Sequence, residues 1–168
     1  MEKASKSPIS LKHQLPPSLQ RILICNTQRD LSIDPQWIKD AVSFLLSTLK
    51  ISTDEITIHF VTQKKIAQLH AEFFNDPTST DCITFPIDPP TKAKGSYHVL
   101  GELFVCPKVA SDYAREHGIA PSEELLRYVT HCILHLIGYT DLQPDERKKM
   151  KRKESLLVKK LRVHGFLD

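Results

Sequence analysis

The segment Thr130-His-Cys-Ile-Leu-His-Leu-Ile-Gly-Tyr-Thr-Asp141 is the most informative part of this sequence. Pro121, followed by an acidic first turn, predicts the start of a helix that leads into the segment, and Gly138 predicts the end of that helix. Within the helix, His131 and His135 are four positions apart. At 3.6 residues per turn, their side chains lie on one face, about 6 Å apart along the axis. The spacing therefore allows both imidazoles to reach one metal ion.

Asp141 adds a third candidate ligand to this pair. A glycine at position 138 favours a left-handed conformation that turns the chain back toward the same face, so that Asp141 can present its carboxylate to the same ion. Two imidazoles and one carboxylate leave a fourth tetrahedral position for water, as in catalytic zinc sites. We therefore predict that His131, His135 and Asp141 bind one Zn²⁺ per chain and carry the catalytic chemistry.

A second interpretation of these three residues stays open. Both histidines could be ordinary helix residues with satisfied hydrogen bonds, while Asp141 caps the following helix. Peptide hydrolysis is disfavoured, because the H-E-x-x-H metalloproteases place a glutamate directly after the first histidine and this chain has Cys132 there.

Hydrophobic periodicity predicts interleaved strands and helices around the histidine segment. Strands are expected at 21–26, 55–61, 82–87 and 98–106, and helices at 35–49, 63–73, 107–117, 121–137 and 144–163. Pro86, inside the third strand, favours the edge of a sheet or the end of the strand. The pattern indicates a layered α/β fold, a single compact domain of about four strands and about five helices with the metal site on a central helix. The parallel or antiparallel order of the strands stays open.

A length of 168 residues predicts one domain. Residues 1–19 contain three prolines and three lysines, so we expect a flexible N-terminal arm followed by a domain at 20–168. The sequence has no apolar run near the roughly 20 residues of a membrane span and no recognisable signal peptide, which predicts a cytoplasmic protein without a membrane partner. Four scattered cysteines are interpreted as small buried residues in a reducing compartment: Cys25, Cys82, Cys106 and Cys132.

The histidine segment resembles the signature of the YbeY family of bacterial endoribonucleases, H-G-x-L-H-L-x-G-Y-D-H followed by a Met and a Glu in the next helix. The positions in register are His131, Leu134, His135, Leu136, Gly138, Tyr139, Met150 and Glu154. Two further segments, 79–86 and 100–106, are similar to the family's P-T-[DN]-V-L-S-F-P stretch and to its L-G-D-[IL]-x-[IL]-[CS] strand. The resemblance extends over about residues 21–160.

This resemblance implies a compact α/β fold, one zinc ion and cleavage of single-stranded RNA. The expected role is 3′ end maturation of 16S rRNA and ribosome quality control, with ribosomal RNA, the small ribosomal subunit and a ribosome-assembly GTPase as partners. The alternative is a ribosome-associated assembly factor that binds rRNA or small-subunit proteins with weak or no catalysis. A metal-dependent hydrolase of another substrate ranks last.

Two departures from the family pattern bear on activity. Asp141 stands where the family has its third histidine ligand, which makes the net charge of the site more negative by one unit and should weaken its attraction to phosphate. Phe74 stands where the family usually has an arginine that could clamp phosphate. Phe73 and Phe74 could stack on an unpaired base, but the favoured interpretation is two core residues at a helix end.

The remaining polar and charged positions are less decisive. Between Arg147 and Arg162 nine lysines and arginines face one acid, Glu154, which we interpret as a salt-bridge partner among the lysines. The basic residues form either an ordinary solvated face or a stripe that follows RNA phosphates beside the metal site. Glu102 could orient a ligand or contact a partner, and Thr84 stands where the family has a serine.

Overall fold

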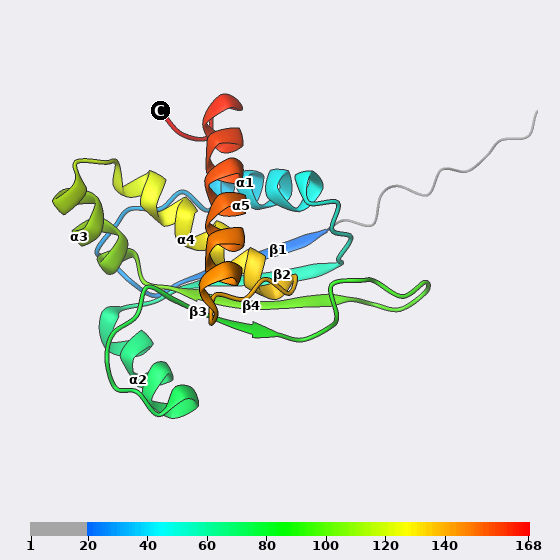
Figure 1. Ribbon diagram of the computed structural model, residues 1–168, viewed down its shortest axis with the longest axis horizontal. Helices are drawn as coiled ribbons and strands as arrows, with labels where there is room; N and C mark the ends of the chain where they lie inside the picture. The colour runs from blue at the N-terminus through cyan, green and yellow to red at the C-terminus, as the bar shows by residue number, and fades with distance from the viewer. Residues whose placement is uncertain (1–19) are drawn as a thin grey trace, which may run out of the picture.

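A four-stranded mixed sheet forms the base of the fold in the computed structural model, which describes residues 20–168 (Figure 1). The strands are β1 (Arg21–Asn26), β2 (Glu55–Phe60), β3 (Cys82–Pro86) and β4 (Val99–Val105), in the spatial order β1-β2-β4-β3. The β1–β2 and β2–β4 pairs are parallel, and β3 runs antiparallel to β4. Pro86 ends β3 at a sheet edge, as predicted.

Five helices complete the described chain, which confirms the predicted α/β fold class. They are α1 (Pro35–Thr48), α2 (Gln63–Phe74), α3 (Pro107–His117), α4 (Pro121–Leu136) and α5 (Pro144–Val163). Their ends follow local signals: the Asp34 side chain accepts a hydrogen bond from the Gln36 N–H at the start of α1, and Gly118 ends α3 with a φ of 65°. The expected arm at residues 1–19 lies outside the described residues.

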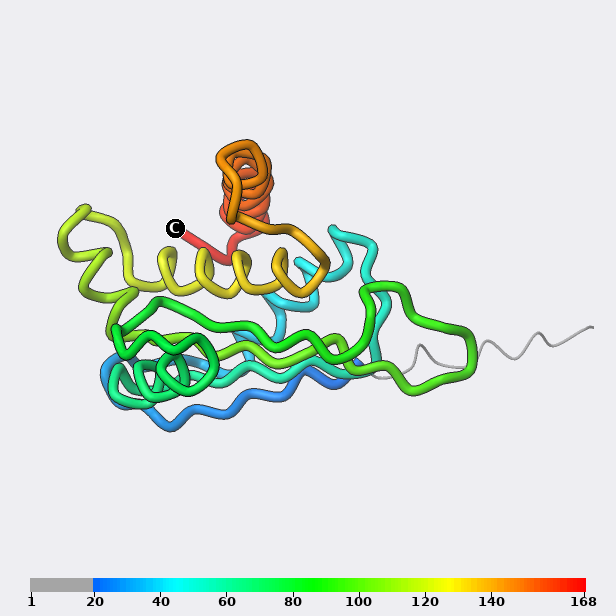
Figure 2. Tube along the Cα trace, turned by 60° about the horizontal axis from the view of Figure 1, so that its bottom comes forward, coloured from blue at the N-terminus to red at the C-terminus, as the bar shows by residue number. Residues whose placement is uncertain are grey.

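Helix α4 lies at the centre of the molecule. It packs on β3 and β4 and is flanked by α3 and α5, and α5 stands across it on the side away from the sheet (Figure 2). Ten residues of α4 are buried, because the helix is covered on several sides, and all of them except Glu124 and Thr130 join the core formed by α1, α5 and the sheet. The metal site was predicted to lie on a central helix, and the histidine helix occupies that position.

Gly101 sets how closely α4 approaches the sheet. A Cβ atom at this position would lie 2.5 Å from the Phe85 carbonyl oxygen and 2.7 Å from Cδ2 of Leu136, the last residue of α4. Its φ of 155° is also unfavourable for a residue with a side chain. The glycine therefore lets the end of α4 that carries His135 pack directly on β3 and β4.

A second, smaller apolar cluster joins α2 to the other face of the sheet. Ile66 of α2 packs there with Ile83, while Cys82 and Thr84, the neighbours of Ile83 in β3, point toward α4. Cys106 and Cys132 are buried as predicted, but the prediction is wrong for Cys25, which is exposed on edge strand β1. Within residues 20–168, no helix is both long enough and apolar enough to cross a membrane.

Candidate metal centre

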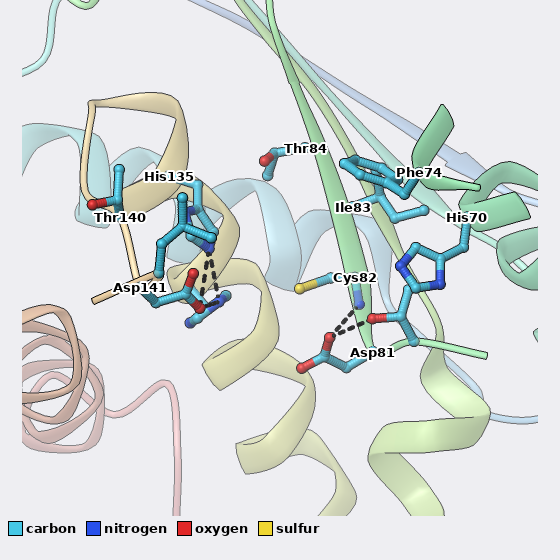
Figure 3. A pocket seen from close by; sticks show the side chains of 12 residues that line it. His70, Phe74, Asp81, Cys82, Ile83, Thr84, His135, Thr140 and Asp141 are labelled. Atoms are coloured by element: carbon cyan, nitrogen blue, oxygen red, sulfur yellow. Dashed lines mark hydrogen bonds and ion pairs between the residues drawn. The ribbon is translucent and has the colours of Figure 1, made fainter. Parts of the chain in front are cut away.

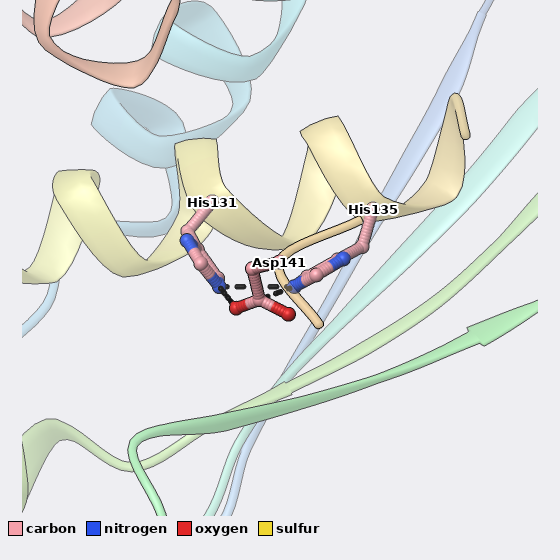
Figure 4. A group of neighbouring side chains, drawn as sticks. All are labelled: His131, His135 and Asp141. Atoms are coloured by element: carbon pink, nitrogen blue, oxygen red, sulfur yellow. Dashed lines mark hydrogen bonds and ion pairs between the residues drawn. The ribbon is translucent and has the colours of Figure 1, made fainter. Parts of the chain in front are cut away.

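The structure brings His131, His135 and Asp141 together at the end of α4 (Figure 4). The two Nε2 atoms are 3.0 Å apart, and Oδ2 of Asp141 lies 3.7 Å from Nε2 of His131 and 3.8 Å from Nε2 of His135. One ligand atom from each residue lies within 4.8 Å of the others. The spacing predicts that these three side chains lie on one side of the helix and of the loop that follows it. In the structure their ligand atoms do lie close together.

The loop after α4 returns Asp141 to the histidines. Gly138 has a φ of 99°, and its N–H donates to the His135 carbonyl oxygen over 3.0 Å. The Tyr139 N–H donates to the Leu134 carbonyl oxygen, also over 3.0 Å. These bonds close the helix in a left-handed turn, as expected from the glycine. Asp141 is not the cap of α5, because Gln143 occupies that position and forms a capping box with Glu146.

Hydrogen bonds to the other ring nitrogens orient both imidazoles. Nδ1 of His131 donates to Oε2 of Glu154 over 3.0 Å, and Nδ1 of His135 donates to the Tyr139 carbonyl oxygen over 2.9 Å. A carboxylate and a carbonyl oxygen can only accept, so both Nδ1 atoms carry the proton. In the neutral form of each ring, Nε2 then carries the lone pair and is directed toward Asp141, which is the arrangement that metal-ligating histidines require.

Charges around His131 favour its protonation when no ion is bound. Burial lowers the pKa of His131, but the hydrogen bond and the negative charge of Glu154 outweigh burial, and Asp81 and Asp141 add to the effect. The net result is a raised pKa. Arg127 holds the second oxygen of Glu154 over 3.2 Å, so the carboxylate is fixed from two sides.

The donor set fits a small divalent cation. A tetrahedral ion with bonds of about 2.0–2.1 Å separates its ligand atoms by roughly 3.3 Å, close to the separations found here. Two nitrogens and one carboxylate oxygen form a ligand set that zinc and other first-row divalent metals accept. Cys82 lines the same cavity, and contact with the Cys132 thiol raises the pKa of the Cys82 thiol well above its usual range.

The three residues open onto a cavity of about 420 Å³ between α4 and β3 (Figure 3). His135, Thr140 and Asp141 lie on one side of it, and Asp81, His70 and Phe74 lie on the other. Leu142 lines the same cavity from the loop that carries Asp141. Among the residues that the structure describes, no lysine or arginine lines this space.

The favoured interpretation of Phe73 and Phe74 is wrong. Neither belongs to the core, since their side chains are 56% and 55% exposed, respectively. Phe74 faces the cavity, whereas Phe73 packs edge-on against Phe85 at a ring distance of 4.9 Å. The helical spacing of apolar residues in α2 suggested burial, but only Ile66 and Leu69, in the earlier turns of α2, are buried.

Two glutamates have partners that the sequence did not predict. Glu154 contacts His131 and Arg127 rather than the neighbouring lysines. The periodicity of α5 was a usable signal, because Glu154 follows the buried Met150 by four positions and so lies on the same face. Glu102 does not orient a metal ligand, because it pairs with His59 over 2.7 Å on the face of the sheet that points away from α4.

Sequence reasoning missed two residues of this cavity: His70 lies in α2, and Asp81 ends the loop between α2 and β3. No periodic or spacing signal links either residue to the histidine segment. Arg147, in the first turn of α5, donates from Nε to the Asp141 carbonyl oxygen over 3.1 Å. The basic residues of α5 thus begin next to the loop that carries Asp141, and Lys148, Lys151 and Arg152 are exposed.

Comparison with known proteins assigns the chain to a family. Residues 23–162 match the family described as endoribonuclease YbeY. A Chlamydia felis protein named endoribonuclease YbeY is 41% identical over 152 residues, which cover 88% of this chain and 96% of that protein. The Chlamydia muridarum protein of the same name is 42% identical over 138 residues, which cover 82% of this chain and 84% of that protein.

A solved structure shares the fold. The solution structure of TM1509 from Thermotoga maritima aligns with a TM-score of 0.56 and 24% sequence identity, over 87% of this chain and 95% of that one. The family match spans most of the sequence, and the relatives agree with it over nearly their whole length. The chain therefore belongs to the endoribonuclease YbeY family.

Proposed function

We propose that this protein is a zinc-dependent endoribonuclease that cuts single-stranded RNA. The observation that carries the proposal is the convergence of two Nδ1-protonated imidazoles and one carboxylate on an accessible cavity, in a chain whose relatives are named endoribonucleases. His131, His135 and Asp141 are the proposed metal ligands and catalytic residues. A zinc ion held there would supply a Lewis acid for a phosphodiester at neutral pH.

The chain's own residues would prepare the site for this chemistry. Glu154 and the Tyr139 carbonyl oxygen hold the Nδ1 proton of each ring, so that Nε2 is the nitrogen that would bind a metal ion. Asp141 adds a negative charge that reduces the positive charge of the loaded site. Binding of the phosphodiester must therefore draw on positive charge outside the cavity, and the first turns of α5 are the nearest basic segment along the chain.

The substrate class follows from the recessed position of the site. The three proposed ligands lie between α4 and β3, which favours a flexible RNA strand that can bend into the cavity over a rigid duplex. Unpaired segments of structured RNA meet this requirement. We propose 3′ end maturation of 16S rRNA and ribosome quality control in the cytoplasm as the setting, with ribosomal RNA, the small ribosomal subunit and a ribosome-assembly GTPase as partners.

A second candidate is an assembly factor that binds rRNA or small-subunit proteins with weak or no cleavage. The absence of lysine and arginine from the cavity lining within the described chain favours it, because a developing negative charge on phosphate then has no cationic side chain beside it. Phe74 occupies the position at which the family's arginine would place a cationic side chain in the cavity.

Metal analysis and a cleavage assay together test the proposal. We expect purified wild type to contain about one zinc ion per chain and to cleave ribosomal RNA, with cleavage lost in chelator and in His131→Ala. Zinc absent from wild type, or unchanged in His135→Ala, would contradict the metal site. RNA binding without metal-dependent cleavage would favour the assembly factor, and gain of cleavage in Phe74→Arg would identify the missing cation as the cause.

A further inference from the structure

We propose that Phe74 is a stacking platform for one unpaired base of the RNA, on the wall of the cavity that faces the metal ligands. This inference rests on the proposed function and names how its substrate is held. The base next to the reacting phosphate would stack on Phe74. The phosphate itself would lie on the opposite side of the cavity, beside His135 and Asp141.

The position of Phe74 supports this role. It is the last residue of α2, its side chain is 55% exposed, and it lines the same cavity as His135 and Asp141 (Figure 3). More than half of a large apolar side chain therefore remains in contact with water beside polar groups. Leu142, 80% exposed on the opposite wall, is a second apolar group in the same cavity. Together they offer apolar contacts from both walls.

The ring of Phe74 is held in place before a ligand arrives. Asn75 ends α2 in a left-handed conformation with a φ of 57°, and its N–H bonds to the carbonyl oxygens of Ala71 and His70. The imidazole of His70 lies against the Phe74 ring with the centroids 5.5 Å apart at 47°. A platform fixed in this way loses little conformational entropy when it binds.

The loop after α2 in turn holds His70. Nδ1 of His70 donates to the Thr78 carbonyl oxygen over 2.9 Å. The Thr78 N–H and hydroxyl both donate to Oδ1 of Asp76, over 2.9 and 2.7 Å. These bonds lower the pKa of Asp76 and close the loop on itself. The aromatic pair is therefore part of a hydrogen-bonded unit.

The chemistry of this wall selects a base rather than a phosphate. Phenylalanine has no donor for phosphate oxygens, and the nearby Asp81 carboxylate repels an anion. An unpaired base offers an apolar face to stack on the ring and N–H donors that a carboxylate can accept. Base stacking on an aromatic side chain contributes about 5- to 150-fold to affinity.

Phe73 is a matched control within the same helix turn. It is also a phenylalanine and 56% exposed, but it does not line the cavity and instead contacts Phe85. A general loss of exposed aromatic surface would affect Phe73→Leu and Phe74→Leu alike. A base platform predicts an effect for Phe74→Leu alone.

The test measures binding of a single-stranded heptaribonucleotide in chelator, where the RNA stays intact. The same RNA is made with one abasic nucleotide at each position in turn. We expect one position at which base removal weakens wild-type binding by about tenfold or more. Phe74→Leu should bind the intact RNA more weakly by a similar factor. Removal of the base at that position should then cause no further loss of affinity in this variant. Phe73→Leu should behave as wild type.

Phe74→Trp provides a second measurement. We expect it to retain RNA binding and to show fluorescence quenching on addition of intact RNA, absent with the abasic strand. Trp37, the one natural tryptophan, lies on α1 with Nε1 bonded to the Phe166 carbonyl oxygen and reports the background in wild type. Melting temperatures of all variants establish that each is folded.

The outcomes separate the platform from the proposed function. If wild type cleaves RNA with metal present but Phe74→Leu binds like wild type, the platform is wrong and the endoribonuclease stands. If base removal at one position weakens binding only when Phe74 is present, but no metal-dependent cleavage is found, the platform stands and the cleavage proposal fails. Equal losses for intact and abasic RNA overturn the platform, because they indicate a plain apolar contact. Lack of RNA binding by wild type also overturns it.

Discussion

Glu154 of α5 accepts a hydrogen bond of 3.0 Å from Nδ1 of His131 in α4. The same carboxylate accepts a second bond of 3.2 Å from Arg127, one turn earlier on α4. One side chain thus joins two helices and determines which nitrogen of His131 faces Asp141. The orientation of His131, a proposed metal ligand, therefore depends on the packing of α5 on α4.

Replacement of Glu154 should weaken metal binding. We expect Glu154→Ala to reduce zinc affinity by about 10–100-fold, since His131 loses the acceptor that orients it. Glu154→Gln keeps an acceptor oxygen and should lose less. Arg127 retains Glu123 and Glu124 as partners, so the fold should survive. Calorimetric titration with zinc measures the effect, with the exposed Glu116→Gln as control; equal affinities for Glu154→Ala and wild type would contradict the assigned role.

Metal binding should depend on pH through His131. A ligand imidazole must be neutral, so zinc affinity is greatest above the raised pKa of His131 and falls as the pH drops through it. Glu154→Gln removes the hydrogen-bonded negative charge that raises this pKa, and the midpoint of the affinity curve should move to lower pH. Zinc titrations between pH 5 and 8, a range set by the usual histidine pKa, test the shift.

The stability of the metal-free protein should show the opposite pH dependence. Because the pKa of His131 is higher in the folded than in the unfolded chain, its protonated form stabilises the fold below the ordinary histidine pKa of about 6.5. That contribution is lost as the pH rises through the raised pKa. Urea unfolding in chelator should therefore separate wild type from His131→Gln more at acidic than at alkaline pH, and a constant difference would exclude the linkage.

Gly101→Ala should destabilise both the fold and the site. A methyl group there meets the Phe85 carbonyl oxygen and Leu136, so we expect a loss of about 3 kcal/mol from overpacking. Gly95→Ala is the control, because its φ of 77° is also positive but no heavy atom lies within 4 Å, and it should cost about 1 kcal/mol. Urea denaturation compares the two. Similar losses of unfolding free energy in the two variants would show that the positive φ, and not the close approach of α4, causes the destabilisation.

Charge reversal on the first half of α5 should weaken RNA binding. Lys148 and Arg152 are exposed on the first half of α5, which begins after the loop that carries Asp141. Reversing both charges should lower the salt slope of RNA binding by about 1.4. Lys149 is left unchanged because it lies over the Tyr139 ring at 5.8 Å.

Lys159→Glu with Lys160→Glu is the control for this pair. It makes the same charge change on the same helix, roughly 16 Å farther along the axis from Lys148. Filter binding of single-stranded RNA at several salt concentrations compares the two double variants. Equal effects from both would indicate non-specific attraction, and no effect from either would remove α5 from RNA binding.

The features that the amino-acid sequence was sufficient to predict depend on interactions between residues that are close in the chain. The Asp34-Pro35 start of α1, the Gly118 end of α3 and the i, i+4 histidines of α4 all depend on helix geometry over a few residues, and all were found as expected. Asp141 was also within reach of such reasoning, since the turn at Gly138 returns the chain over only a few bonds. The three candidate ligands could therefore be named from spacing.

Only the packed structure settled contacts between distant segments. How the layers stack decides the antiparallel placement of β3 and the reach of Glu154 to a residue 23 positions earlier. It also decides that Phe74 lines the same cavity as the candidate metal ligands. Apolar periodicity shows which face of a helix can be buried, but it does not show how far the neighbouring element extends along that face. For this reason Phe74 and Cys25 were expected inside and lie outside: Phe74 lines a cavity, and Cys25 lies on the face of β1 opposite Ile22 and Ile24, which pack on the core.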